Sequence, residues 1–182
     1  MEPSADILAG EAELVRDYLA GSARAAQEIV GLHYRRIYNF IYQMTRQQQD
    51  AEDITQQTFV KAFKNLDRFD PRRPLANWLF TIARRTALNH FRSARTWEEI
   101  PDQTASSQPS PAEVTEGSDQ VDRIWDTARR VLSAREFQIL WLRFGENLSI
   151  EETAEAAGLT KIHVRVMVHR ARKRLMEMQG QP

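Results

Sequence analysis

Arginine and lysine gather in two stretches of this sequence, residues 72–95 and residues 160–175. Each stretch holds six of these cations, and neither contains an aspartate or a glutamate. Between them, residues 96–118 hold five acids and no base, so the formal net charge of zero conceals an uneven distribution. Guanidinium and ammonium groups without competing carboxylates bind phosphate oxygens, and the two stretches therefore predict contacts with nucleic acid. Solvated helix faces are the alternative, which would explain the arginines but not the exclusion of acids.

The C-terminal basic stretch has the pattern of a helix-turn-helix. A short helix from Ser149 to about Ala157 would end at Gly158, because glycine adopts the left-handed conformation of a C-cap at little cost. Thr160 can then cap a second, longer helix. One buried stripe is predicted on that helix at Val164, Val168, Ala171 and Leu175. A plain helical hairpin with a basic exposed face is the alternative.

The opposite side of this second helix would face the major groove of DNA. Arg165 is the best candidate for a bidentate contact with guanine, and Val166 could contact a thymine methyl group. The other cations, together with Arg174, would mainly pair with phosphates, which set the register without carrying sequence information. The residues predicted to face DNA are Lys161, Arg165, Val166, His169, Arg170, Arg172 and Lys173.

Helical periodicity runs through nearly all of the N-terminal half, and strand patterns are almost absent. Helices are predicted at residues 11–20, from residue 22, from residue 50 with Asp50 as the N-cap, and at residues 75–93. The predicted buried stripe of the last of these helices is Leu75, Trp78, Leu79, Ile82, Ala83 and Thr86. This stripe places Trp78 in the core and leaves Phe80 outside it.

Residues 96–118 differ from the rest of the chain in composition. They hold three prolines, several serines and threonines, and little that could be buried, so they predict a flexible acidic linker. After the linker, Ser133 with Glu136 and Ser149 with Glu152 form two capping-box signatures. The predicted fold is all-α, with two small helical domains, residues 11–95 and 119–178, joined by this linker.

Nothing in the sequence supports enzyme chemistry. The four histidines are scattered without ligand spacing, and no glycine-rich phosphate loop or nucleophile motif is present. Without cysteine there is neither a disulfide framework nor a thiolate metal site. No apolar run approaches the roughly 20 residues of a transmembrane helix, and the first residues are acidic, unlike a signal peptide. We therefore predict a cytoplasmic protein with no catalytic site, cofactor, metal or membrane insertion.

Three segments resemble the extracytoplasmic function (ECF) branch of the sigma-70 family. Residues 50–59 (DAEDITQQTF) are similar to the family's region 2.2, residues 77–84 (NWLFTIAR) to regions 2.3 and 2.4, and residues 148–159 to region 4. The resemblance implies a region 2 helical bundle followed by a region 4 helix-turn-helix. It also implies a sigma factor, which binds core RNA polymerase and recognises the −35 and −10 elements of promoter DNA.

The resemblance further implies partners and polymerase-binding residues. In the family, the region 2.2 helix docks on the coiled coil of the largest polymerase subunit, region 4 meets the polymerase flap, and an anti-sigma factor often inhibits the protein. The residues assigned to polymerase binding in this way are Asp50, Asp53, Gln56, Gln57 and Phe59, with Glu52 near them. Phe59 fits a place in the core equally well.

For the −10 element, the family uses the loop before its long helix to capture a flipped base, and here that loop spans residues 69–74. Phe80 is the candidate for stacking because it lies outside the predicted stripe. The residues assigned to −10 DNA are Arg72, Arg73, Phe80, Arg84, Arg85 and Arg92. The chain departs from the family where Arg85 replaces a common Asn, and where Val166 and Met167 replace the usual Ser and Arg. A promoter sequence therefore cannot be transferred from the family.

Two other functions compete with this prediction. A stand-alone helix-turn-helix regulator would bind a palindromic duplex by itself, whereas a sigma factor would bind DNA very weakly without polymerase. A helical adaptor would regulate polymerase without reading DNA, so neutralising the recognition-helix arginines would leave its activity unchanged.

Overall fold

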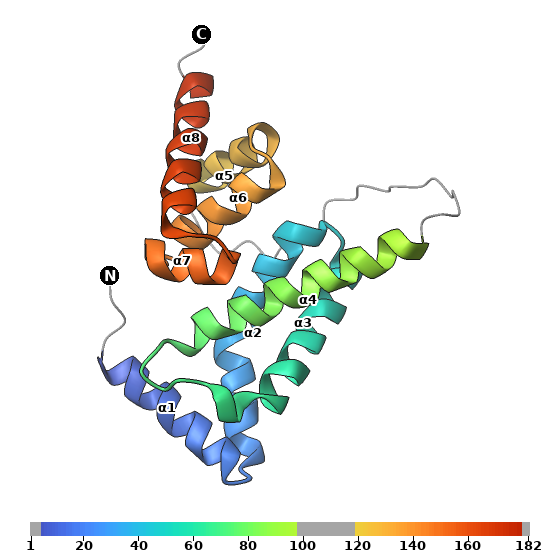
Figure 1. Cartoon of the computed structure of the whole chain (residues 1–182), viewed down its shortest axis with the longest axis vertical. Helices are drawn as coiled ribbons and strands as arrows, with labels where there is room; N and C mark the ends of the chain where they lie inside the picture. Colours follow the sequence, from blue (N-terminus) through green and yellow to red (C-terminus); the bar gives the residue numbers. More distant parts are fainter. Residues whose placement is uncertain (1–4, 98–118, 180–182) are drawn as a thin grey trace. The chain divides into compact units, whose positions relative to one another are not determined.

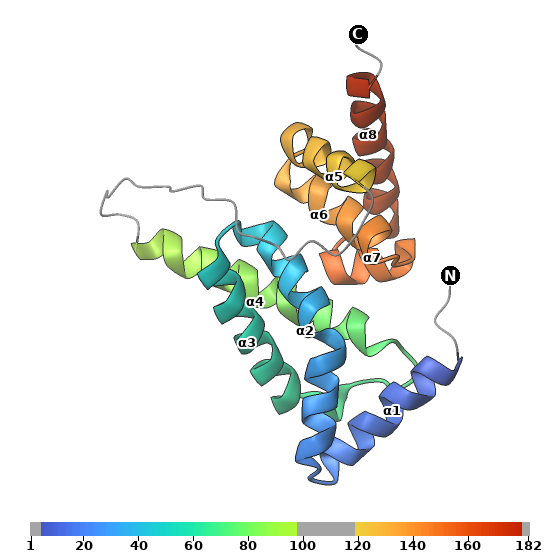
Figure 2. The ribbon, with the colours of Figure 1, turned by 180° about the vertical axis from the view of Figure 1, so that it is seen from behind.

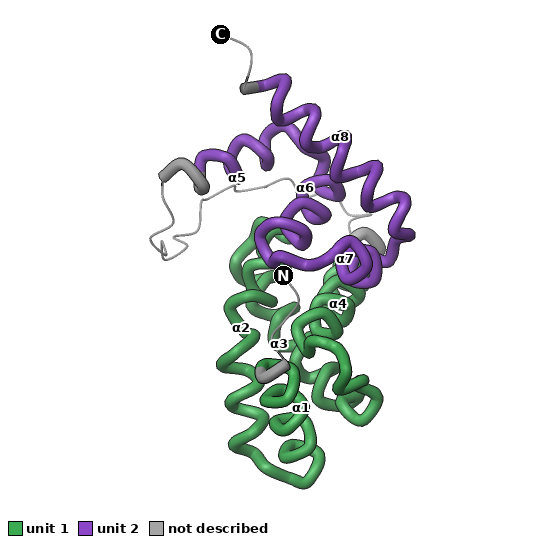
Figure 3. The backbone as a smooth tube through the Cα atoms, turned by 90° about the vertical axis from the view of Figure 1, so that its left-hand side faces the viewer, with its two compact units in different colours: residues 1–106 green, residues 107–182 purple. Residues whose placement is uncertain are grey.

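The computed structural model describes residues 5–97 and 119–179. Within these residues there are α-helices and two short helical turns but no strand, which confirms the all-α prediction. The chain divides into two compact units, residues 1–106 and 107–182 (Figure 3), and each unit is described by itself. Of the predicted linker, residues 98–118 lie outside the described residues, while residues 96 and 97 end a helix.

The described part of unit 1, residues 5–97, is a bundle of four α-helices, whose arrangement is shown in Figure 1. Its elements are α1 (Ala5–Leu19), α2 (Ala23–Thr45), α3 (Gln48–Lys64), the 3₁₀ turn η1 (Leu66–Arg68) and α4 (Leu75–Trp97). Helix α2 packs against α1, α3 and α4, and α3 also packs against α4. Ser22 caps α2 by accepting a hydrogen bond from the Ala25 amide at 3.2 Å, as predicted. Asp50 does not cap α3, because the helix begins two residues earlier and Asp50 lies in its first turn.

The core of unit 1 is centred on two phenylalanine rings, and one of them corrects the sequence analysis. Phe40 of α2 and Phe80 of α4 are fully buried and meet edge to face, with ring centroids 5.2 Å apart. Ala76 and Ala87 of α4 are buried as well, whereas Trp78 is only partly buried. The buried residues of the predicted stripe are Leu75, Leu79, Ala83 and Thr86. The buried face of α4 is wider than this stripe, because α4 packs against two helices, α2 and α3.

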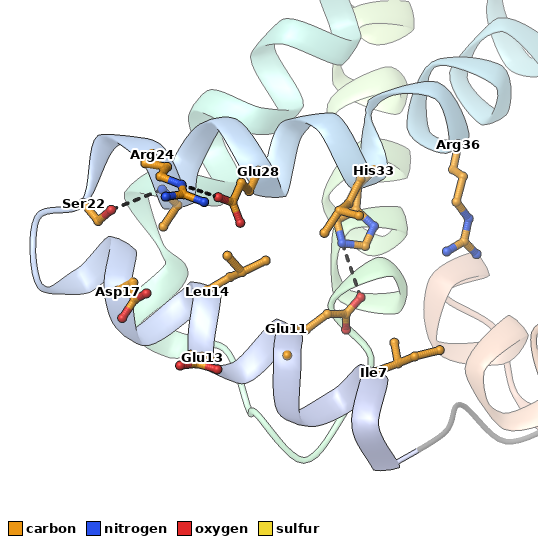
Figure 4. Close-up of a pocket in the computed structure, with 13 residues that line it drawn as sticks. Ile7, Glu11, Glu13, Leu14, Asp17, Ser22, Arg24, Glu28, His33 and Arg36 are labelled. Carbon is orange, nitrogen blue, oxygen red and sulfur yellow. Dashed lines mark hydrogen bonds and ion pairs between the residues drawn. The ribbon is translucent and has the colours of Figure 1, made fainter.

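A buried carboxylate joins α1 to the start of α4. Glu11 Oε2 accepts a hydrogen bond from the Leu75 amide at 2.8 Å, and Glu11 Oε1 lies 3.3 Å from His33 Nε2 on α2 (Figure 4). Burial raises the pKa of Glu11, but His33, the Leu75 amide and Arg36 outweigh it, so the pKa lies below its ordinary value. Figure 2 shows the N-terminal part of α1 beside the loop that leads into α4. We call these contacts of Glu11 with the Leu75 amide and His33 the Glu11 latch, and they fix where α4 begins.

Unit 2 consists of α5 (Asp119–Val131), α6 (Ala134–Leu140), the π-helical turn η2 (Trp141–Gly145), α7 (Ile150–Ala157) and α8 (Lys161–Gln179). Helices α5, α6 and α7 all pack against α8. Both predicted capping boxes are present, with Ser133 and Glu136 at α6 and with Ser149 and Glu152 at α7. Each box satisfies amide groups that the first turn of a helix leaves free, so both helix starts are fixed by residues within four positions of one another.

The core of unit 2 lies where α5 and α6 meet α8. Its buried residues are Ala128, Leu132, Phe137, Leu140 and Ala171, flanked by the partly buried Trp125, Val131, Trp141, Val168 and Leu175. Trp125 stands edge to face against Phe137, with centroids 5.7 Å apart, and also contacts Trp141 at 5.0 Å. This core holds α8 by one side only, so the other side stays open to solvent.

Candidate nucleic-acid interface and partner-binding face

The turn between α7 and α8 has the geometry of a helix-turn-helix. Gly158 ends α7 in the left-handed region, with φ 61° and ψ 43°. The Leu159 amide donates to the Ala154 carbonyl at 2.8 Å, which completes the C-cap. Thr160 Oγ1 then accepts from the His163 amide at 3.3 Å and starts α8. The predicted glycine turn and threonine cap are both confirmed.

Helix α8 separates into a buried and an exposed side. Val164 and Ala171 are buried and Val168 and Leu175 partly buried, which confirms the predicted stripe. All seven residues predicted to face DNA are exposed, namely Lys161, Arg165, Val166, His169, Arg170, Arg172 and Lys173. Ile162 is 69% exposed and Val166 41%, so an apolar pair one turn apart lies within this basic surface. Helical spacing places Ile162 on the same side of α8 as Arg165, but the sequence analysis assigned no DNA contact to it.

Three cations of α8 form ion pairs within unit 2, and one of them is Lys173, whose Nζ lies 3.8 Å from Glu177 Oε1. Lys161 Nζ lies 3.0 Å from Glu151 Oε1, and Arg174 Nη1 donates to Glu136 Oε2 at 2.8 Å. Burial raises the pKa of Glu136, but hydrogen bonds from Ser133 and the charge of Arg174 outweigh it, and the pKa is lowered overall. Arg174 is therefore a partner of the α6 capping box within unit 2, a contact that the sequence analysis did not predict.

The loop before α4 exposes two arginines next to one carboxylate. Arg72 forms a bidentate pair with Asp70, with both N–O distances at 2.9 Å, and Arg73 lies 3.9 Å from the same carboxylate. Hydrogen bonds from Arg72 lower the pKa of Asp70 to about 2. Asp70 stands two positions before Arg72, just outside the acid-free stretch of residues 72–95. Asp70 therefore holds Arg72 in position and offsets part of the charge of the loop.

Phe80 cannot stack on a base in this structure. The prediction placed it outside the buried stripe, but its ring is fully buried, with the guanidinium of Arg36 5.7 Å from its centroid. Trp78 is the partly exposed aromatic residue of the pair, and it packs beside Phe69 of the loop at 5.7 Å. The two residues thus exchange the roles that the sequence analysis gave them. Among the predicted cations of α4, Arg85 and Arg92 are exposed and Arg84 is partly exposed.

The predicted partner-binding residues of α3 divide between surface and core. Asp53, Gln56 and Gln57 are exposed, and together with Val60, Lys61 and Lys64 they line a shallow groove of about 530 Å³. Val60 is 53% exposed and was missed by the sequence analysis. We call this set the α3 face.

Phe59 and Asp50 lie outside the α3 face. Phe59 is buried against Tyr34, with ring centroids 6.2 Å apart, so the alternative that it belongs to the core is the correct one. Asp50 points toward α4, where its Oδ1 lies 3.5 Å from His90 Nε2. Phe59 therefore offers no exposed aromatic ring on the α3 face.

Among the residues that the structure describes, no three histidine, aspartate or glutamate side chains come together as metal ligands. Nor is any helix in that part of the chain long and apolar enough to cross a membrane.

Two family models match the two units. Sigma-70 region 2 matches residues 29–97, and sigma-70 region 4 matches residues 130–177. These matches define the class, a sigma factor with a region 2 and a region 4.

Two curated relatives identify the branch of the sigma-70 family to which this chain belongs. The ECF RNA polymerase sigma factor BldN of Streptomyces coelicolor is 30% identical over 91% of this chain, which covers 64% of that protein's length. The RNA polymerase sigma factor YlaC of Bacillus subtilis is 30% identical over 82% of this chain and 88% of its own length. This chain belongs to the ECF branch of the sigma-70 family and is an RNA polymerase sigma factor, a DNA-binding transcription initiation factor.

Two solved structures share the fold. CnrH, in complex with the cytosolic domain of CnrY, has a TM-score of 0.65 at 24% identity and covers 93% of this chain and 96% of its own. The sigma factor RpoE of Bartonella quintana, in complex with the anti-sigma factor NepR, has a TM-score of 0.64 at 22% identity, covering 86% and 98%. The resemblance to a sigma factor in the sequence analysis is confirmed by the family models and the relatives.

Proposed function

We propose that this sigma factor binds core RNA polymerase through the α3 face, reads −35 duplex DNA with α8 and holds the unpaired −10 strand at the start of α4. The observation that carries this proposal is the exposed side of α8, whose position is set by the Gly158 turn and which presents basic and apolar groups together. In this proposal residues 11–95 act as region 2 and residues 119–178 as region 4.

The −35 contacts follow from the chemistry of the exposed side of α8. Arg165 is placed to donate two hydrogen bonds to a guanine edge, and Val166 to contact a thymine methyl group. Arg170, Arg172, Lys173 and the remaining exposed residues, Lys161 and His169, would contact mainly phosphates. Phosphate contacts supply affinity and register, so sequence preference would depend on few side chains.

The −10 contacts are proposed for the loop and the first turns of α4. Arg72 and Arg73 are placed for phosphates of a single strand, and the partly exposed Trp78 replaces Phe80 as the ring available for stacking. Arg84, Arg85 and Arg92 lie farther along α4 and would follow the backbone. Trp78 rests on Phe69, so its ring is supported from one side.

The contact with polymerase is proposed for Asp53, Gln56, Gln57 and the exposed Val60. An apolar side chain surrounded by polar groups that can form hydrogen bonds suits a helix that carries arginines. The coiled coil of the largest polymerase subunit is the proposed partner for this face, and the flap is the proposed partner for unit 2.

Regulation by an anti-sigma factor in the cytoplasm is part of the same proposal. CnrH and the Bartonella RpoE were each solved with such a protein or a cytosolic domain bound, and the shared fold supports the same type of partner for this chain.

Reconstitution with purified core RNA polymerase of the source bacterium tests the proposal. The chain should bind core polymerase stably, and sequencing of transcript 5′ ends should reveal new start sites that share upstream elements. If the chain does not bind core polymerase but binds a palindromic duplex tightly by itself, the stand-alone regulator is the correct function. If promoter-dependent transcripts persist unchanged after Arg165→Ala, the adaptor is favoured instead.

A further inference from the structure

A groove of about 760 Å³ lies between α1 and α2 of unit 1 (Figure 4), and the proposed function does not use it. None of its described lining residues belongs to the α3 face. On each helix the lining residues recur every three or four positions, so two helix ridges form the walls, and such a groove is the type of surface into which a partner helix packs. The residues of these ridges are Ile7, Gly10, Leu14 and Asp17 on α1, and Glu28 and Leu32 on α2.

The walls of the groove expose apolar side chains on both helices. Ile7 on α1 is 57% exposed and Leu32 on α2 is 59% exposed. Gly10 lies in the α1 wall, and a Cβ added there would meet no atom of the described part of the chain within 4 Å, so no internal contact requires a glycine. Glycine destabilises the interior of a helix relative to alanine. Close approach of a second segment to the α1 backbone is the reason for this glycine that remains.

Carboxylates outnumber cations in the groove. Four carboxylates and two guanidinium groups line it, and one of the two cations, Arg24, is already paired with Glu28, with Nε and Oε1 2.7 Å apart. Glu13 and Asp17 are exposed, and no cation of the described residues pairs with either of them. These two carboxylates therefore favour an occupant that carries lysine or arginine.

One end of the groove holds a buried imidazole that lacks a donor. His33 is 4% exposed and lines the groove beside Glu11 (Figure 4). Its Nε2 lies 3.3 Å from Glu11 Oε1, whereas its Nδ1 has no hydrogen-bond partner among the described residues. A carboxylate cannot donate, so the proton of a neutral His33 belongs on Nε2, and Nδ1 is left as an acceptor. A buried acceptor without a partner costs free energy, which favours an occupant with N–H donors.

We propose that this α1–α2 groove binds a basic amphipathic helix of a protein partner that acts on the assembled holoenzyme. The apolar side of that helix packs between Ile7 and Leu32, and the absent side chain of Gly10 lets it approach α1 closely. Its lysine or arginine side chains pair with the two exposed carboxylates of α1, Glu13 and Asp17. This partner and core polymerase bind at the same time, because the groove and the α3 face are built from different residues.

Filling the groove tests this proposal. The probe is a labelled leucine–lysine peptide of about 15 residues, long enough to form an amphipathic helix, and fluorescence anisotropy measures its binding to the full chain. Gly10→Leu should weaken the dissociation constant about tenfold or more, since the new side chain occupies the groove without an internal clash. Gly31→Leu is the matched control, because Gly31 on α2 has equally open surroundings but does not line the groove, and its affinity should equal that of the wild type.

Thermal unfolding shows whether the two glycine variants fold. Both should unfold at or above the temperature of the wild type, because leucine replaces a glycine inside a helix in open space. A loss of peptide binding by Gly10→Leu in a fully folded chain is then an effect on the groove. Unchanged affinity for Gly10→Leu would overturn the proposal.

Charge provides a second test. Asp17→Asn keeps the shape of the α1 wall but removes a carboxylate, and it should weaken binding of the leucine–lysine peptide about two- to fivefold. A leucine–glutamate peptide with the same apolar pattern should not bind. Equal binding of the two peptides would show that the groove does not select a basic partner, and the proposal would be wrong.

Core polymerase separates this proposal from the proposed function. The leucine–lysine peptide should bind the preformed holoenzyme as tightly as it binds the free chain. If core polymerase displaces the peptide, the groove belongs to the polymerase-binding surface and the proposal is overturned. If the chain does not bind core polymerase at all, the proposed function fails, and the titration of the free chain decides on the groove by itself.

Discussion

The two units differ in how they position the cations that we propose to face DNA. In unit 2, the exposed side of α8 is positioned by a glycine turn and a threonine cap that act over a few residues. In unit 1, α4 is positioned by groups far away in sequence, since Glu11 accepts from Leu75 64 residues later and Phe40 of α2 packs on Phe80. Substitution of the residues of α8 predicted to face DNA should therefore alter DNA binding alone. Comparable changes in unit 1 should alter folding as well, because its candidate site lies directly on the core.

Truncation of Phe80 should have the largest effect, and it tests whether the candidate site of unit 1 lies directly on the core. Phe80→Ala removes a fully buried ring, and it should lower the free energy of unfolding of unit 1 by about 3–5 kcal/mol, measured by denaturant unfolding. Trp78→Ala is the matched variant, and it should cost less stability because Trp78 is partly exposed, while weakening binding of a −10 single strand in the holoenzyme. If Phe80→Ala folds normally and loses only strand binding, the stacking role first predicted for Phe80 is right.

Removing the Glu11 latch should have the next largest effect. Glu11→Ala leaves the Leu75 amide without its partner and should lower the free energy of unfolding by about 1–3 kcal/mol. The folded pKa of Glu11 is lowered, so its contribution is present at neutral pH and is lost as the pH falls below the ordinary value of 4.5 toward the folded pKa.

The difference in stability between wild type and Glu11→Ala should therefore shrink as the medium is acidified. Glu11→Gln serves as the control, because it keeps an acceptor for the Leu75 amide without a charge, and its loss should be smaller. A difference that stays constant between neutral pH and about pH 3 would contradict the latch as a charged group.

Substitutions of two arginines of α8 should separate DNA binding from stability in unit 2. Arg165→Ala should cost about 1–3 kcal/mol in binding at one −35 position without changing stability. Arg174→Ala should instead lower the stability of unit 2, because it leaves Glu136 without its cation, and should leave base preference unchanged. Promoter variants assayed with the holoenzyme, together with thermal unfolding, distinguish the two outcomes. An equal loss for Arg165→Ala on all promoters would exclude base reading.

The smallest effect is expected in the loop before α4. Asp70→Asn removes the carboxylate that holds Arg72 and Arg73, so one further cation becomes available to phosphate. The salt dependence of single-strand binding by the holoenzyme should steepen by about 0.7 in the logarithmic slope. Stability near neutral pH should be unchanged, because the pair is exposed. A slope that stays the same would show that the loop does not contact phosphate.

Most of unit 2 could be predicted from its sequence. The two capping boxes, Gly158, Thr160 and the stripe at Val164 and Ala171 all take the predicted places. The contact of Arg174 with Glu136 could not be predicted, because it depends on a residue 38 positions away.

In unit 1 the helices were predictable but their buried faces were less so. Phe80 was predicted outside the buried stripe, and Phe59 was assigned equally to the surface and to the core, but both are buried. A helix turns by about 100° per residue, so a buried face that is one position wider than the predicted stripe brings a further aromatic side chain into the core. The width of the buried face depends on how many neighbours a helix has, and a single sequence stretch does not contain this information.

The sequence by itself determined the all-α class, the glycine turn and cap of the helix-turn-helix, and the basic exposed side of α8. Each of these follows from hydrogen bonds or periodicity within a few residues, which act whatever the rest of the chain does. The tertiary structure alone decided how wide a face of α4 is buried, that Glu11 accepts a hydrogen bond at the start of this helix, and that Tyr34 of α2 packs on Phe59 of α3. These depend on the packing of helices distant in sequence, where burial of large rings outweighs local preference.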